Sequence, residues 1–570
     1  MKFFVKPLGR SRFIEIKAHF EAITETETVV QLASWRPGRY EMGNFAKNIR
    51  KFRVFNENGK TLLYRKQSKD SWCIVNPEML DFTIAYEYYA NELNAGSTYS
   101  GADLLFINPI NCFIFLAKQI DMACSLELDI PIGIEIATTL QKHGDYFTAK
   151  NIHEMLDSPI LCSPNLEKMS FVYDSVTFNL WFYGKNSLNK SVFADEVKQY
   201  TAAQKAVFKE FDSTEYNYYY IFLPTRFHHG VEHVDSTVIV MGPGEQFHEL
   251  DYHQNLLAIS SHELFHYWNI KRIRPQTMFP YDYSRENYSE LGFVYEGITT
   301  YFGDYMLLKS AVFSFEDYVN QFNADLDKHY ENEGRFNYSL GHSSFDTWLD
   351  GYVPGVPGRK VSIYTEGMLA ALILDVELRK SSNNNFCLAD VMHFMYSEIY
   401  KSNKGYTLDD FINLCRRGAN KNIGRLIQEL VFEIGYINTY LEESLNYIGL
   451  TLEVKESEFI HEQKYGFKIS NGSVPVISVV DSNSPAEEAG LCVNDALLLV
   501  NNAPVDNGAD WNQAFLSGGE VMAWNAIEGN KAVRLRNDGT SYFESKRLIK
   551  VKNCSANQKL NFEIWSGQSF

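Results

Sequence analysis

The sequence has no long apolar run and no leader-like amino terminus. No window approaches the roughly 18 apolar residues that a membrane-spanning helix needs. The first residues, MKFFVKPLGRSRFIEIKAHF, carry a charge every few positions and lack the continuous apolar segment of a signal peptide. These absences predict a cytoplasmic protein that does not interact with membranes.

Positive charge and paired cysteines are also scarce. The chain has 53 Lys and Arg against 71 Asp and Glu, a net charge of −18. Nucleic-acid affinity depends on cations that neutralise phosphates, so no nucleic-acid partner is expected. The 8 cysteines are scattered without a CxxC pair. At this density in a large chain they are interpreted as reduced core thiols rather than a disulfide framework.

The chain is too long for one hydrophobic core, and its hydrophobic pattern changes twice. Residues 1–160 read as strands and predict an all-β domain, whereas residues 254–450 have mostly helical periodicity. Short strand patterns return after residue 450. The fold class predicted is multidomain α+β, with domains at 1–160, 161–446 and 447–570. The polar segment FHHGVEHVD, residues 227–235, is predicted to be a turn between two strands.

One short motif carries the chemistry. Residues 262–266 read His-Glu-Leu-Phe-His, an H-E-x-x-H pattern, on a predicted helix. His262 and His266 then share one face, about 6 Å apart at Cβ, and can bind one metal ion. Glu263 lies beside the first ligand, where it can accept a proton from water. From composition alone, roughly 0.02 such motifs are expected by chance in a chain of this kind, so a chance occurrence is the weaker interpretation.

A third ligand is expected at Glu296. This residue opens another amphipathic helix among the apolar residues Phe293, Val294 and Ile298. A carboxylate on a buried face needs a partner, and a metal ion is a suitable one. Two histidines and one glutamate, with water in the fourth position, form a known catalytic zinc set, so one Zn²⁺ per chain is predicted. A surface glutamate is the plainer alternative.

The longer block from His262 to Pro275, HELFHYWNIKRIRP, resembles the glycyl aminopeptidase family, PDZ-containing zinc metallopeptidases with a thermolysin-like catalytic domain. The family pattern is H-E-x-x-H-x-W-N-x-K-R-x-R-P. The resemblance extends to the turn SWRPGRY at 34–40 and to LDSP at 156–159. It implies an N-terminal β domain (1–160), a thermolysin-like zinc peptidase domain (161–446) and a PDZ-like domain (447–570).

The resemblance also implies roles for residues outside the metal set. Gly230-Val231-Glu232-His233 is similar to the family's G-G-L-E-H, which makes Gly230 and Glu232 substrate-binding residues and Glu232 the anchor of the substrate's α-ammonium group. His229 replaces the first glycine. The segment starting at Tyr364 resembles Y-x-K-G-x-L, so Tyr364 is expected to stabilise the oxyanion. Glu366 stands where lysine is usual.

Near the C-terminal end, the stretch Ser484-Pro-Ala-Glu-Glu-Ala-Gly490-Leu resembles a PDZ domain of the protease-associated type. Ser484 suits a helix N-cap, Pro485 the first turn and Gly490 the helix end. A peptide C-terminus is therefore a candidate ligand of this domain. Residues 447–450, Tyr-Ile-Gly-Leu, are interpreted as its carboxylate-binding loop or, equally well, as the start of a strand.

Together these interpretations predict a metal-assisted hydrolase with Glu263 and Tyr364 as catalytic residues. The first hypothesis is a zinc aminopeptidase that removes small N-terminal residues from peptides with a free amino terminus, the glycine and alanine preference being inferred from the family. The second is a zinc endopeptidase of the same chemistry, in which Glu232 is structural. The third is a PDZ peptide-binding protein with a vestigial metal site.

Overall fold

The computed structural model describes residues 1–353, 355–419, 422–472, 474–506 and 508–570. Its contacts define two compact units. The first consists of 1–318, 334–448 and 559–570, and the second of 319–333 and 449–558. Both β and helical parts of the first unit belong to one body, and the three predicted domain boundaries stay a prediction. Among the described residues, none of the helices is both long and apolar enough to cross a membrane.

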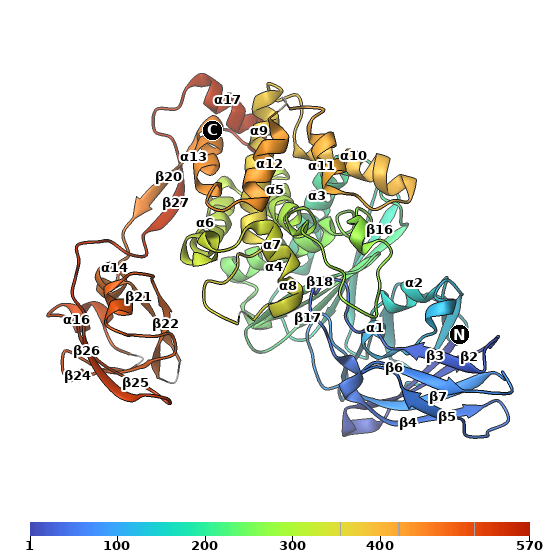
Figure 1. Ribbon diagram of the computed structural model, residues 1–570. Helices are drawn as coiled ribbons and strands as arrows, with labels where there is room; N and C mark the ends of the chain where they lie inside the picture. Colours follow the sequence, from blue (N-terminus) through green and yellow to red (C-terminus); the bar gives the residue numbers. More distant parts are fainter. Residues whose placement is uncertain (354, 420–421, 473, 507) are drawn as a thin grey trace. The chain divides into compact units, whose positions relative to one another are not determined.

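The first 160 residues fold into β-sheets (Figure 1, blue). Strand β2 shows why: its alternate residues Ile14, Ile16, Ala18 and Phe20 are fully buried, as a sheet with one covered face requires. The main sheet runs, in spatial order, β12 (Gln141–His143), β13 (Tyr146–Ala149), β10 (Cys124–Leu128), β1 (Lys2–Pro7), β2 (Phe13–Phe20), β7 (Phe82–Tyr89) and β4 (Ile49–Asn56). Two smaller sheets run β3 (Glu27–Gln31), β6 (Ser71–Val75), β5 (Leu63–Lys66), and β11 (Glu135–Thr138), β14 (Ile160–Ser163), β9 (Leu105–Ile107), β8 (Tyr99–Ser100).

A five-stranded mixed sheet begins the catalytic region. Its order is β15 (Glu167–Tyr173), β16 (Val176–Tyr183), β17 (Glu215–Phe222), β19 (Ser236–Gly242) and β18 (Phe227–Glu232). The prediction of a turn at 227–235 was wrong, because β18 is an edge strand paired antiparallel with β19 from Phe227 to Glu232. An edge strand needs pairing on one side only, so it tolerates the polar residues that suggested a turn.

Helices form the rest of the first unit. Helices α3 (Lys190–Phe208) and α4 (Leu250–Phe265) pack on the sheet, α5 (Thr299–Lys309) packs on α4, and α9 (Thr365–Ser381) packs on α5. A π-helical turn, η6 (Phe293–Ile298), precedes α5 and packs on α9. The remaining helices of this unit are α1 (Pro109–Cys112), α2 (Ile152–Leu156), α7 (Leu340–Phe345), α8 (Thr347–Asp350), α10 (Leu388–Phe394), α11 (Leu408–Cys415), α12 (Ile423–Phe432) and α13 (Ile437–Tyr447).

The second unit contains the PDZ-like sheet, β21 (Phe467–Asn471), β22 (Pro475–Val480), β23 (Ala496–Val500), β25 (Glu520–Asn525) and β26 (Gly529–Arg534). The capping prediction is confirmed: the Ser484 side chain accepts from the backbone N–H of Glu487, Pro485 opens α15 (Pro485–Glu488), and Gly490 has φ +83°. The other elements here are α6 (Phe315–Glu331), β20 (Leu450–Lys455), α14 (Ile460–Tyr465), β24 (Ala503–Pro504), α16 (Trp511–Phe515) and β27 (Ser545–Lys550), with α17 (Ala556–Ser566) leading back to the first unit.

The interpretation of residues 447–450 as a carboxylate-binding loop was wrong. Tyr447 ends α13, and Leu450 starts β20, which pairs with β27 in a separate two-stranded sheet. The alternative reading, a strand start, is the one observed. The segment beside the edge strand β21 is instead α14, whose His461 ring packs 5.2 Å from Phe467 and 5.5 Å from Phe515.

Candidate active site

Helix α4 brings His262 and His266 together. Their Nε2 atoms lie 3.0 Å apart, as the i, i+4 spacing on one helix face predicts. The helix ends at Phe265, earlier than its periodicity suggested, and His266 is its C-cap. The chain then turns back, so that Nδ1 of His266 lies 3.0 Å from the carbonyl oxygen of Asn269. Because that oxygen can only accept, Nδ1 carries a proton, which leaves Nε2 as the ring atom able to bind a metal.

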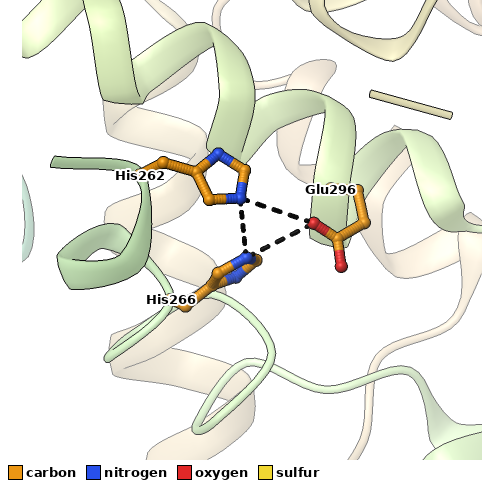
Figure 2. Close-up of side chains that lie close together, drawn as sticks. All are labelled: His262, His266 and Glu296. Atoms are coloured by element: carbon orange, nitrogen blue, oxygen red, sulfur yellow. Dashed lines mark hydrogen bonds and ion pairs between the residues drawn. The ribbon is translucent and has the colours of Figure 1, made fainter. Parts of the chain in front are cut away.

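Glu296 completes the cluster from the π-helical turn η6. Its Oε2 lies 3.3 Å from Nε2 of His266 and 3.7 Å from Nε2 of His262 (Figure 2). The close packing of η6 on α9 depends on Gly297, since a Cβ there would lie 2.4 Å from Cα of Gly367. Single π-helical turns of this kind are frequent at functional sites.

The cluster has the chemistry of a metal site. One ligand atom from each of His262, His266 and Glu296 lies within 4.8 Å of the others, and two imidazole nitrogens with one carboxylate oxygen are a zinc donor set. Three buried carboxylates meet here: Glu232, Glu263 and Glu296 are 3%, 5% and 2% exposed. Buried anions need cations, so the residues fit a divalent metal.

The electrostatics reflect this excess of negative charge. Burial lowers the pKa of His266, but the carboxylate of Glu296 outweighs burial and raises it to about 10. Burial raises the pKa of Glu263 to about 8. Both directions are those expected where carboxylates crowd together out of water. A dication in the cluster relieves both.

Glu263 points from α4 toward the edge strand β18. A Cβ on Gly230 would lie 2.2 Å from Oε1 of Glu263, so only glycine leaves room for this carboxylate. Oε2 of Glu263 has no hydrogen-bond partner among the described residues. The structure therefore gives Gly230 a steric reason for being glycine, while its predicted contact with substrate stays a prediction.

Glu232 lies two residues further along β18. Its Oε1 has no hydrogen-bond partner in the described part of the chain. Oε2 faces the turn at 36–40 of the N-terminal domain, since a Cβ on Gly38 (φ +81°) would be 2.5 Å from it. The chain after Glu232 is held by Asp157, whose Oδ2 accepts a 2.7 Å hydrogen bond from the backbone N–H of Val234. Asp157 also pairs with Lys271 at 2.9 Å.

Tyr364 lies at the N-terminus of α9 and turns toward the cluster. Its ring centroid is 6.3 Å from that of His262, and its hydroxyl lies 3.4 Å from the hydroxyl of Tyr352. Burial, followed by the charge of Glu296, raises the pKa of Tyr364 well above its usual range, so the hydroxyl keeps its proton. Glu366, which stands where lysine is usual in the family, is 4% exposed and lies inside the helix packing rather than at the surface.

Sequence reasoning missed two residues of this site. Tyr40 donates from its hydroxyl to Oε1 of Glu296 at 2.8 Å, and Asp157 fixes the chain beyond Glu232. Both stand inside motifs that were noted, at 34–40 and 156–159, but only as parts of a resemblance. Trp35 helps to place the turn, because its Nε1 donates to the carbonyl of Asp282 at 2.7 Å.

The fold and the histidine–glutamate cluster define a metallopeptidase of the H-E-x-x-H class. Family profiles match three segments: residues 8–164 match the Peptidase M61 N-terminal domain, 255–370 match M61 glycyl aminopeptidase, and 476–522 match a PDZ domain. Over residues 8–164 and 255–370 the chain is similar to the M61 glycyl aminopeptidase family. The predicted fold class, a β domain, a helical catalytic region and a PDZ domain, is confirmed.

The solved structures that are similar to this chain include the following two. An aminopeptidase N family protein from Idiomarina loihiensis is 23% identical over 99% of each chain, with a TM-score of 0.88. An M1 zinc metallopeptidase mutant from Deinococcus radiodurans, bound to a Tyr-Ser-Ala substrate, is 11% identical over 75% of this chain and 92% of its own, with a TM-score of 0.46. The first shows the fold. A comparison with curated protein sequences found no match.

Proposed function

We propose that this protein is a zinc aminopeptidase that removes small N-terminal residues, by family preference glycine or alanine, from peptides with a free amino terminus. The proposal rests on the environment of Glu232. Its carboxylate is 3% exposed, Oε1 is unpartnered among the described residues, and the metal cluster is adjacent. The α-ammonium group of a peptide is a cation of the right size to pair with it.

The turn at 36–40 supports exopeptidase action. Gly38 approaches Oε2 of Glu232 so closely that no side chain fits between them. A peptide whose ammonium group pairs with Oε1 of Glu232 therefore meets this turn, not open groove, on the amino side of its first residue. This wall favours the aminopeptidase over the endopeptidase hypothesis.

Each residue then has a chemical task. His262, His266 and Glu296 are the residues that hold zinc, one ion per chain, which when bound supplies Lewis acidity to the scissile carbonyl and to water. Glu263 accepts the proton of the attacking water and passes it to the leaving amine. Tyr364 donates its hydroxyl to the oxygen of the former carbonyl as charge develops there. Glu232 fixes the amino end, so the bond after the first residue is the one presented.

The test compares glycine and alanine p-nitroanilides with their N-acetylated forms. The proposal predicts chelator-sensitive hydrolysis of the free-amine substrates only, with Glu263→Gln inactive but still binding zinc. Equal hydrolysis of the acetylated substrates would support the endopeptidase. No hydrolysis of either, with less than one zinc per chain, would support the binding protein.

We also propose that the PDZ-like unit takes a peptide C-terminus at β21, the end strand of its sheet. PDZ domains bind an extended peptide as an added strand. Titrating labelled peptides that differ only in a free or amidated C-terminus tests this. Equal affinity for the two forms would contradict carboxylate recognition.

A further inference from the structure

Arg36 is a buried cation without a carboxylate partner. Its side chain belongs to a residue only 5% exposed, and the described residues provide no ion pair for it. Among the described residues, its side chain makes one hydrogen bond, from Nη1 to the carbonyl of Pro37 at 3.3 Å. The neighbouring Arg39 is different, because it pairs with Glu41. Burial, followed by Arg39, lowers the pKa of Arg36 to about 10, so it stays charged at neutral pH.

The guanidinium group lines a cavity of about 260 Å³ in the N-terminal domain. Arg39, Lys47 and Asn111 contribute to the same lining, and so do two carboxylates: Glu41, which pairs with Arg39, and Glu92, which accepts a hydrogen bond from Asn94. The group lies against Gly96, where a Cβ would be 2.0 Å from Cζ of Arg36. Glycine at this position therefore lets the guanidinium lie flat along the cavity wall. A buried, unpaired arginine in a polar cavity of this size is suited to an anion.

The cavity lies one turn away from the catalytic cluster. Arg36 begins the turn whose Gly38 touches Glu232 and whose Tyr40 bonds Glu296. Arg36 is also close enough for the charge of Glu232 to act on it. A short peptide anchored by its ammonium at Glu232 thus has a buried cation within reach of its other end or of a nearby side chain.

We propose that this cavity binds a carboxylate of the peptide substrate and that Arg36 is the residue that holds it. The inference rests on the proposed aminopeptidase function. It narrows the substrates to two kinds of peptide: peptides so short that the C-terminal carboxylate lies close to the amino end, and peptides with an acidic side chain close to the amino end. A planar guanidinium can bind either carboxylate through two parallel hydrogen bonds.

Binding is measured first, on the Glu263→Gln variant, so that hydrolysis is not required. The probes are Gly-Ala-Ala and its C-terminal amide, then Gly-Glu-Ala-amide and Gly-Gln-Ala-amide, each by calorimetry. We expect a preference of about tenfold or more for the carboxylate in at least one pair. The first pair reports the terminal carboxylate and the second the side chain.

Three substitutions in the same background separate binding from structure. Arg36→Met is expected to abolish the preference while leaving affinity for the neutral amides unchanged. Arg36→Lys should keep part of it, because an ammonium can form a single charged hydrogen bond. Lys60→Met, which removes an exposed lysine of the same domain outside the cavity, should keep it fully.

The outcomes are distinguishable from failure of the proposed function. A carboxylate preference that Arg36→Met removes supports the inference even if the active protein cleaves nothing. Two results would overturn the inference. One is equal affinity of Glu263→Gln for the carboxylate and amide peptides. The other is an equal loss of affinity for both kinds of peptide when Arg36→Met is added. In that case Arg36 only balances the charge of Glu232. For the hydrolytic protein, the same preference should appear in KM rather than kcat.

Discussion

The hydroxyl of Tyr40 donates a 2.8 Å hydrogen bond to Oε1 of Glu296, across 256 positions of sequence. The other carboxylate oxygen faces the two histidines, so Tyr40 selects which oxygen is presented to a metal. The N-terminal β domain thereby takes part in the metal cluster. Groups that orient metal ligands in this way affect metal affinity.

Replacing Tyr40 with phenylalanine should weaken zinc binding by about 10- to 100-fold, because Glu296 loses the bond that orients it. Competition with a chromogenic chelator measures this directly. Tyr86→Phe is the control, since Tyr86 is as deeply buried but bonds the carbonyl of Cys112 instead. The control should lose stability and keep its zinc affinity. Equal zinc affinity in both variants would show that Tyr40 has no orienting role.

The metal cluster could be predicted because its signals are local. His262, Glu263 and His266 lie within five residues, and helix geometry alone places both histidines on one face. Glu296 could be predicted from a carboxylate among apolar neighbours, which needs a buried cation. The positions of these atoms agree with that reasoning, whereas the roles of the residues stay predictions.

The rest depended on contacts that no local pattern contains. Tyr40 and Asp157 act on residues more than 70 positions away, so their roles follow only from the folded chain. Strand β18 was missed because its polar sequence lacks alternation, although pairing with β19 is enough to form it. The interpretation of residues 447–450 failed for the opposite reason: a short apolar run fits a strand and a binding loop equally well.

Gly230→Ala should reduce activity at least 100-fold while leaving zinc content at the parental value. The added methyl group would lie 2.2 Å from Oε1 of Glu263, so the carboxylate must move away from its working position. Activity on alanine p-nitroanilide and metal analysis together check the prediction. Gly355→Ala is the matched control, because a Cβ there meets nothing within 4 Å. Unchanged activity in Gly230→Ala would mean that Glu263 is free to shift without loss.

Asp157→Asn should lower stability by about 3 kcal/mol, because it leaves the buried ammonium of Lys271 without its partner. Burial raises the pKa of Asp157, but Lys271 and then His233 outweigh it and hold the pKa well below its usual range. The contribution of Asp157 to the free energy of unfolding is thus complete above about pH 4 and is lost only as the pH falls further. Calorimetric unfolding at pH 7 measures the loss.

The Lys271→Met change tests whether that loss comes from the unpaired charge. Added to Asp157→Asn, it should restore part of the lost stability, because no buried cation remains. If the double variant is no more stable than Asp157→Asn, the unpaired charge of Lys271 is not the cause of the loss. KM for free-amine substrates should rise in Asp157→Asn in either case, since Glu232 precedes Val234 by two residues.

We expect His461 to make the second unit sensitive to mild acid. The residue is 2% exposed, its ring packs against Phe467 and Phe515, and its Nδ1 has no hydrogen-bond partner among the described residues. Burial lowers its pKa to about 4, against about 6.5 in an unfolded chain. The neutral ring is favoured by folding, so its contribution is complete above pH 6.5 and falls as the pH drops toward 4. The loss amounts to about 3 kcal/mol.

Calorimetry of the full chain between pH 7.5 and 4.5 checks this, with His461→Phe as the comparison. Phenylalanine fills a similar volume and cannot be protonated, so the unfolding temperature of the second unit should fall less with acid than in the parent. The two proteins should differ little at pH 7.5 and increasingly below pH 6.5. A constant difference across this range would show that protonation of another group, not of His461, controls the acid response of the unit.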